Sequence, residues 1–165
     1  MGVALNDPVV AERTYNNELV KKILVDDGLW PTVTEDGMSV SEFYPDCKKD
    51  CYLLVKNKAD GILGVYNLHP INSATLQIHA QVFPRYRKAY SKQTGYATLR
   101  WIKDNSPKDF VKVIAIIPCL YPNVHDFTLM FGFELEGVLS CSFKKNGVLH
   151  DQWILGLSRS DIPEN

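Results

Sequence analysis

Residues 76–87 read Leu-Gln-Ile-His-Ala-Gln-Val-Phe-Pro-Arg-Tyr-Arg, and this stretch determines how the rest of the chain is interpreted. Its small and apolar side chains recur at every second position, which is the period of a strand with one buried face: Leu76, Ile78, Ala80 and Val82. The pattern predicts a strand over residues 74–83 that stops at Pro84, because proline cannot donate to a sheet ladder. We expect a basic turn over residues 85–88 and then a helix over residues 91–105.

More strands are expected on both sides of this stretch. Residues 51–56 and 62–69 are short apolar runs joined by Asp60-Gly61, a dipeptide typical of tight hairpins. Three antiparallel strands therefore follow one another. Residues 111–117 form a β-branched run of the kind found in strands that are buried on both faces. Because a helix separates this run from the third strand, the two are expected to pair in parallel.

A helix is expected near the start of the chain, over residues 16–26. Its apolar side chains fall on one face, Asn16 or Asn17 can cap it, and Gly28 is expected to end it. Residues 30–44 are harder to interpret and are compatible with a second short helix or a loop.

The last third of the sequence predicts a helix followed by a hairpin. Residues 123–131 have a helical pattern that Gly132 closes at a C-cap position. Residues 133–145 and 148–158 are expected to form two antiparallel strands, since Asn146-Gly147 is an explicit hairpin turn.

Length and composition indicate one ordinary globular domain over residues 1–165. The formal charge is −1 with 22% charged residues, which favours neither nucleic acid nor a membrane surface as a partner. No segment has the pattern of a secretory leader or of a membrane span. The four cysteines lack the paired spacing of a zinc site. We therefore expect a cytoplasmic protein with reduced thiols and no bound metal.

Three stretches together resemble the GNAT superfamily of acyltransferases, in the branch that acetylates ribosomal-protein N-termini. In residues 77–87 the similarity is an apolar strand followed by proline, an aromatic residue and arginine. Residues 131–137 are similar to the family's last helix end, and residues 146–153 to its final hairpin. The similarity covers residues 51–159 and extends to diverged GNAT-like proteins of phages. It implies an α/β fold of the α+β kind, with a mixed central sheet, flanking helices and a splayed parallel strand pair.

The resemblance also implies a site for acetyl-CoA as co-substrate. In this superfamily acetyl-CoA lies between the two parallel central strands, expected here over residues 76–83 and 111–117. Backbone groups of Gln81, Val82 and Phe83 would pair with the pantetheine arm. The diphosphate would lie on the following turn and helix start, where unpaired amides and the helix dipole favour an anion. The residues implied there are Arg87, Lys88, Ala89, Tyr90, Ser91 and Lys92, with Asn123 at the start of the later helix.

The chain departs from the family's phosphate-binding pattern. That pattern is arginine or glutamine, two variable residues, glycine, one variable residue, and glycine or alanine. Counted from Arg87, Tyr90 and Lys92 occupy the two small-residue positions. A side chain there can block the approach of the phosphates to the backbone, whereas the cations of this segment attract polyphosphate.

The catalytic positions also differ from the family's. Gln77 stands where many relatives have a glutamate base, and an amide cannot accept a proton at neutral pH. His79 lies two residues on, on the same strand face, and is the candidate base. The tyrosine that reprotonates the thiolate in relatives falls near Thr128, so Tyr121, just before the helix, is the candidate acid.

Two functions of different classes follow. The first is an N-acetyltransferase that passes acetyl directly from acetyl-CoA to a small-molecule or protein amine. The second is a catalytically inactive GNAT-like protein that acts as a binding or assembly factor, for example associated with a phage virion. A homodimer or an assembly partner is compatible with either function.

Overall fold

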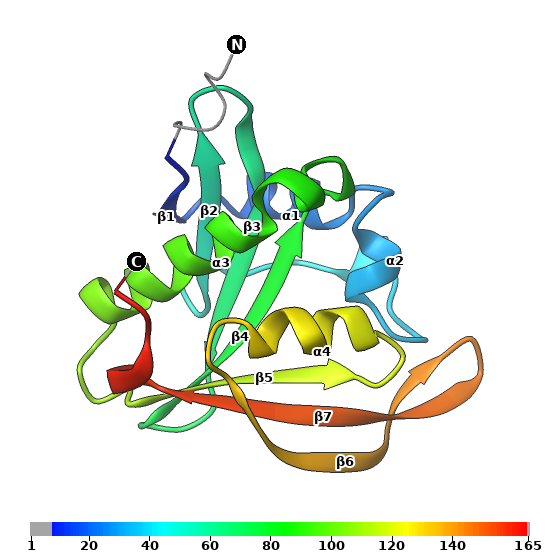
Figure 1. Cartoon of the computed structure of the whole chain (residues 1–165). Coiled ribbons are helices and arrows are strands. Elements are labelled where there is room, and N and C mark those ends of the chain that lie inside the picture. Colours follow the sequence, from blue (N-terminus) through cyan, green and yellow to red (C-terminus); the bar gives the residue numbers. More distant parts are fainter. Residues whose placement is uncertain (1–7, 165) are drawn as a thin grey trace.

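The computed structural model describes residues 8–164, which form one mixed seven-stranded sheet with helices on both faces (Figure 1). The strand order is β1-β2-β3-β4-β5-β7-β6, and every neighbouring pair is antiparallel except β4 and β5. The strands are β1 (Val10–Thr14), β2 (Cys51–Asn57), β3 (Gly61–Pro70), β4 (Thr75–Val82), β5 (Lys112–Pro118), β6 (Glu134–Lys145) and β7 (Val148–Ser158). The predicted α/β class with a mixed central sheet is confirmed.

The helices cover the two faces of the sheet and create two apolar cores. They are α1 (Asn17–Leu24), α2 (Trp30–Val33), α3 (Pro84–Asn105) and α4 (Pro122–Leu129), with single 3-10 turns at Val40–Glu42 and Arg159–Asp161. Alternate residues of β2 serve the two cores: Leu53 packs with α3, and Leu54 packs with α1 on the opposite face. No helix between residues 8 and 164 is both long and apolar enough to cross a membrane.

The first helix has the predicted cap but an earlier end. The Asn16 side chain accepts a hydrogen bond from the Leu19 amide at 3.1 Å, as expected for an N-cap. The helix ends at Leu24 with Val25 as the C-cap, so the end predicted at Gly28 is wrong. The Gly28 amide instead donates to the Asp26 carboxylate at 2.9 Å, which shows that Gly28 belongs to the following turn.

Two boundaries around the sheet also differ from the prediction. Strand β1 was not predicted. It is an edge strand of only five residues, and its pairing with β2 cannot be inferred from its own sequence. The predicted basic turn is wrong as well, since residues 85–88 lie in the first turns of α3. Pro84 occupies the first helical turn, where its missing N–H costs nothing and its fixed φ suits the helix.

The predicted hairpin turn is confirmed, whereas Gly132 lies beyond the C-cap position that was predicted for it. Asn146 and Gly147 have φ values of 52° and 77° and connect β6 to β7, as a tight hairpin turn requires. Gly132 has a φ of 97° and follows α4 two residues after its C-cap, Met130. This left-handed conformation lets the chain reverse from α4 into β6.

Arg159 connects the end of α3 to the end of β7 through side-chain hydrogen bonds. Its Nη1 donates to the carbonyls of Pro107 at 2.7 Å and Phe110 at 3.0 Å. Its Nη2 donates to three more carbonyls of the helix end, those of Ile102, Lys103 and Ser106. These acceptors include carbonyls that a helix C-terminus leaves without intrahelical partners.

We expect Arg159→Ala to lower the free energy of unfolding by about 1.5–3 kcal/mol, because charge-assisted bonds to partly buried carbonyls are lost. Urea denaturation of the two proteins measures this difference. Arg100→Ala is the matched control, since Arg100 is an exposed arginine of α3, and its loss should change stability by less than about 0.5 kcal/mol. Equal effects of the two substitutions would contradict this role for Arg159.

Candidate functional site

The two central strands diverge after three paired residues. Thr75, Leu76 and Gln77 of β4 pair with residues 112–114 of β5, and the ladder stops there. Beyond that point β4 remains paired with β3 as far as Val82, and β5 remains paired with β7 as far as Pro118. Each strand therefore has one free edge that faces the other across a gap. The predicted splayed parallel pair is confirmed.

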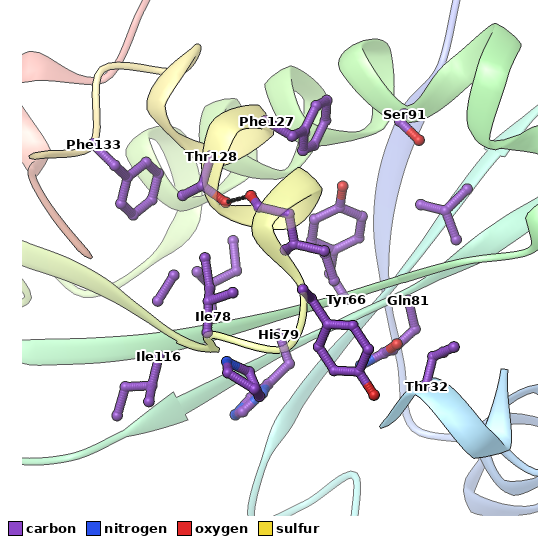
Figure 2. Close-up of a pocket in the computed structure, with 18 of the residues that line it drawn as sticks. Thr32, Tyr66, Ile78, His79, Gln81, Ser91, Ile116, Phe127, Thr128 and Phe133 are labelled. Atoms are coloured by element: carbon purple, nitrogen blue, oxygen red, sulfur yellow. Dashed lines mark hydrogen bonds between the residues drawn. The ribbon is translucent and has the colours of Figure 1, made fainter. Parts of the chain in front are cut away.

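A cavity of about 620 Å³ occupies this gap. Its walls come from β4, β5, α3 and α4, and from α2 and the β6–β7 hairpin. Figure 2 shows Ser91 of α3 and Phe127 of α4 on one side of the cavity, with His79 and Gln81 of β4 on the other. The volume lies within the range of small-molecule and cofactor sites, roughly 300–1,000 Å³.

The wall formed by β4 carries the predicted base. Gln77, His79 and Gln81 alternate along the strand and line the cavity. His79 pairs in register with Asn67 of β3 and is exposed toward the cavity. Desolvation lowers the pKa of the His79 imidazole below its ordinary value, and the positive charge of His69 adds to this effect. His79 is therefore neutral at physiological pH and able to accept a proton.

The wall formed by α3 is a stripe of residues spaced four apart. Arg87, Ser91, Gly95 and Leu99 line the cavity, which extends roughly 18 Å along the helix at 1.5 Å per residue. The Arg87 Nε donates to the Val82 carbonyl at 2.9 Å, so β4 positions the guanidinium. Arg87 is the one permanently charged side chain among the described residues that line this cavity.

The turn predicted for the diphosphate is absent, because residues 87–92 are inside α3. Their amides belong to the helical ladder, so an anion can meet side chains here but not a loop of unpaired N–H groups. Lys88, Ala89 and Lys92 do not line the cavity, since only every fourth residue of the helix faces it. Phe83 does not line it either: its side chain is buried in the core beside α1, and its amide donates to the Leu63 carbonyl.

Tyr90 does not fill the cavity. Its side chain is buried in the core beneath α3, and its hydroxyl donates to the Asp60 carboxylate at 2.6 Å. Asp60 lies in the turn between β2 and β3, away from the gap. The steric obstruction expected from a tyrosine at this position is therefore not present.

The wall formed by α4 carries Tyr121, Asn123 and Thr128. Tyr121 is the N-cap residue of α4 and Asn123 lies in its first turn, and both line the cavity. The Thr128 hydroxyl donates to the Val124 carbonyl at 2.7 Å, so its proton is already engaged. The structure thus brings Tyr121 and Asn123 into the cavity that contains His79, and it leaves Tyr121 as the candidate acid.

No protein-family model matches this sequence, and no curated protein matches it significantly. Solved structures do match the fold. A spermidine N-acetyltransferase from Vibrio cholerae in complex with CoA and spermine has a TM-score of 0.75, at 14% identity, over 93% of this chain and 96% of that one. An acetyltransferase of the GNAT family from Bacillus anthracis has a TM-score of 0.57, at 16% identity, over 66% of each chain. The chain has the GNAT fold.

Within this GNAT fold, one glycine of the α3 wall was missed by the sequence analysis. Residues 92–97 read Lys-Gln-Thr-Gly-Tyr-Ala, so Gly95 and Ala97 have the spacing of the pattern's two small residues, but Lys92 stands where the pattern has arginine or glutamine. A side chain on Gly95 would place its Cβ only 2.3 Å from Cζ of Phe131. The glycine therefore lets the Phe131 ring pack against the helix. The spacing of Gly95 and Ala97 was the signal that could have identified this position.

Two segments far apart in the sequence complete the lining of the cavity. Thr32 and Val33 of α2 and Phe143 and Gln152 of the β6–β7 hairpin line the cavity here, and no local pattern had indicated them. Five hydrogen bonds join the two segments, which we call the α2–hairpin clasp. Lys145 Nζ donates to the Pro31 and Thr34 carbonyls, the amides of Asn146 and Gly147 donate to the Asp36 carboxylate, and the Asp36 amide donates to the Lys144 carbonyl.

Proposed function

We propose that this protein is an N-acetyltransferase that passes acetyl from acetyl-CoA to an amine by direct attack. The observation that carries the proposal is the pair of free strand edges on β4 and β5, which open into a large cavity beside His79. Unpaired backbone groups on a strand edge can pair with an extended amide chain, and the pantetheine arm is such a chain. The fold shared with CoA-binding acetyltransferases supports the same conclusion.

The residues of the cavity fit a CoA thioester in part. Gln81 and Val82 line the cavity on β4, where the pantetheine amides would bind beside the Val82 carbonyl, which already accepts from Arg87 Nε. Arg87 and Ser91 on α3, together with Asn123 on α4, would contact the diphosphate through their side chains. Phe83 is not proposed for this role, because its amide already donates to Leu63.

The proposed reaction needs a base and an acid but no covalent enzyme intermediate. The amine nitrogen forms a bond to the thioester carbonyl carbon, the carbon–sulfur bond breaks, and the CoA thiolate leaves. His79 accepts the proton lost by the amine, and Tyr121 protonates the thiolate. Cys119 is not among the described residues that line the cavity, so the proposed transfer does not use it as a nucleophile.

The acceptor is proposed to enter beside the α2–hairpin clasp. Gln77, His79 and Gln81 alternate with Ile78 and Ala80, so they project from the face of β4 that carries α1 and α2. Thr32 of α2 and Phe143 of the β6–β7 hairpin also line the cavity. We propose a small-molecule or protein amine as the acceptor, in line with the amine bound by the Vibrio cholerae enzyme.

One observation favours the second candidate function, a GNAT-fold protein without transferase activity. The continuous helix from Pro84 replaces the amide-lined turn where a diphosphate would bind most tightly. In that case the cavity would serve a binding or assembly role and would not bind acetyl-CoA.

Acetyl-CoA binding separates the two functions. A ligand that binds the native state raises the melting temperature, by about 5–10 °C at a 100-fold excess over Kd for a chain of this size. We expect acetyl-CoA to produce such a rise, measured by differential scanning fluorimetry. Arg87→Ala should remove most of it, because Arg87 lines the cavity. Lys88→Ala is the matched control, since Lys88 is adjacent in α3 but outside the cavity, and it should keep the rise.

An absence of any shift at millimolar acetyl-CoA would exclude the transferase and leave the second function. A shift that persists in Arg87→Ala would instead overturn only the diphosphate assignment.

A further inference from the structure

A second cavity lies apart from the first and shares no lining residue with it. Its volume is about 180 Å³, and it opens where the C-terminal end of α3 meets the strands. Arg13 of β1 and Lys49, just before β2, line one part of it. The helix contributes Trp101, and Phe110 follows the helix in sequence.

The charged part of this cavity is cationic. Arg13 and Lys49 are the charged side chains that line it, and no described carboxylate does so. The nearby acids already have partners: Glu12 pairs with Lys56 at 3.0 Å, and Asp50 bonds to His69 at 2.7 Å. An anion of suitable size would therefore enter a cavity that is lined by two cations and by no carboxylate of residues 8–164.

Arg13 is held in place with part of its hydrogen-bonding capacity unused. Its guanidinium carbon lies 4.7 Å from the centre of the Tyr15 ring, which fixes one side of the group. Its Nε is buried and has no acceptor among the described protein residues. A buried donor without an acceptor costs about 1–3 kcal/mol, so an acceptor that reaches Arg13 removes a penalty as well as adding an attraction.

Most of the remaining lining is apolar, and its two polar residues, Asn105 and Ser106, donate their side-chain hydrogen bonds to carbonyls of α3. Leu68 and Leu76 of the sheet face Trp101 and Phe110, and both leucines are fully or almost fully buried. Burial also raises the pKa of the Cys51 thiol in the same wall to about 11, against the opposing effect of Arg13. The volume is smaller than that of ordinary drug-sized sites, so the ligand has to be small. An inorganic oxyanion would leave these apolar walls without a partner.

We propose that this cavity binds a small organic carboxylate, whose carboxylate contacts Arg13 and Lys49 while its apolar body packs against Trp101 and Phe110. A guanidinium binds a carboxylate through charge-assisted bonds of well-defined geometry. The site is separate from the proposed transferase cavity, and the inference does not depend on that function.

Benzoate is the probe, since it combines one carboxylate with a compact aromatic body. Isothermal titration of the full chain with benzoate is expected to give a saturable isotherm with a Kd on the order of 1 mM. Benzamide has nearly the same shape without the charge and should bind at least about tenfold more weakly. Arg13→Gln should weaken benzoate to a similar extent, whereas Arg100→Gln, which removes an exposed arginine outside the cavity, should leave it unchanged.

Lys49→Gln provides a second variant if Arg13→Gln does not fold, because Lys49 is exposed and should tolerate substitution. It is expected to weaken benzoate about threefold or more, in keeping with a partly solvated charge contact. Three results would each overturn the proposal: no saturable binding, equal binding of benzamide, or benzoate affinity unchanged in both variants. Binding of inorganic phosphate in place of benzoate would overturn the carboxylate assignment.

Discussion

Replacing His79 with glutamine is expected to lower kcat/KM for acetyl transfer by a factor of about 10²–10⁴, the usual contribution of a general base. Glutamine keeps a polar side chain of similar reach but cannot accept the proton of the amine. The pKa of His79 is lowered by desolvation, so the wild-type rate should rise with pH through a value below 6.5 and then level off. The pH dependence of kcat/KM measures this rise.

His69→Gln is the matched control for this experiment. His69 lies on β3, outside the cavity, and its charge contributes to lowering the pKa of His79. Removing the His69 charge should therefore keep the rise of kcat/KM with pH and move it to slightly higher pH. A His79→Gln enzyme with wild-type rate and an unchanged pH profile would show that another group accepts the proton.

The second large effect is expected on stability, from Gly64→Ala. Gly64 of β3 pairs with Val82 of β4, and an added Cβ would lie 2.2 Å from the Gln81 carbonyl oxygen and 2.8 Å from the Val82 Cα. Both are backbone atoms of β4, so relief requires a shift of the strand itself. We expect a loss of about 3 kcal/mol in the free energy of unfolding, the upper part of the range for overpacking.

Gly137→Ala is the control for the same measurement by urea denaturation. Its Cβ would meet only Cδ1 of Ile154 at 3.8 Å, an ordinary contact on the edge strand β6. Its stability should change by less than about 1 kcal/mol. Because Gln81 and Val82 also line the cavity, Gly64→Ala should reduce the acetyl-CoA-induced rise in melting temperature too. Equal stability of the two variants would mean that β4 can move without cost.

The parts of the fold that local sequence determines were predicted well. The alternation from Leu76 to Val82 predicted β4, and Asn146-Gly147 predicted the hairpin turn, because each depends on side chains or dihedrals within a few residues. Strand β1 was missed because Val10–Thr14 is short and depends on β2 for its pairing. The start of α3 was misplaced because proline both stops a strand and begins a helix, and nothing local decides between the two.

The candidate site was predictable where it follows from β4, the start of α3 and the start of α4. His79, Gln81 and Arg87 line the cavity, as the sequence analysis expected for residues at the end of the third strand. Thr32, Phe143 and Gln152 were not identified, since they meet only after the chain has folded. The roles of Tyr121 and Asn123, which also line the cavity, remain predictions.

The α2–hairpin clasp has a consequence for the order in which the protein is assembled during synthesis. Asp36 is made early, yet its carboxylate binds the amides of Asn146 and Gly147, 110 residues or more further along. Long-range contacts of this kind form late, and on a ribosome they wait for the distal partner to emerge. A nascent chain can therefore fold β2–β4 before Phe143 and Gln152 of the hairpin are in place to line the cavity. The side of the cavity at the α2–hairpin clasp should therefore be completed only in the final stage of translation.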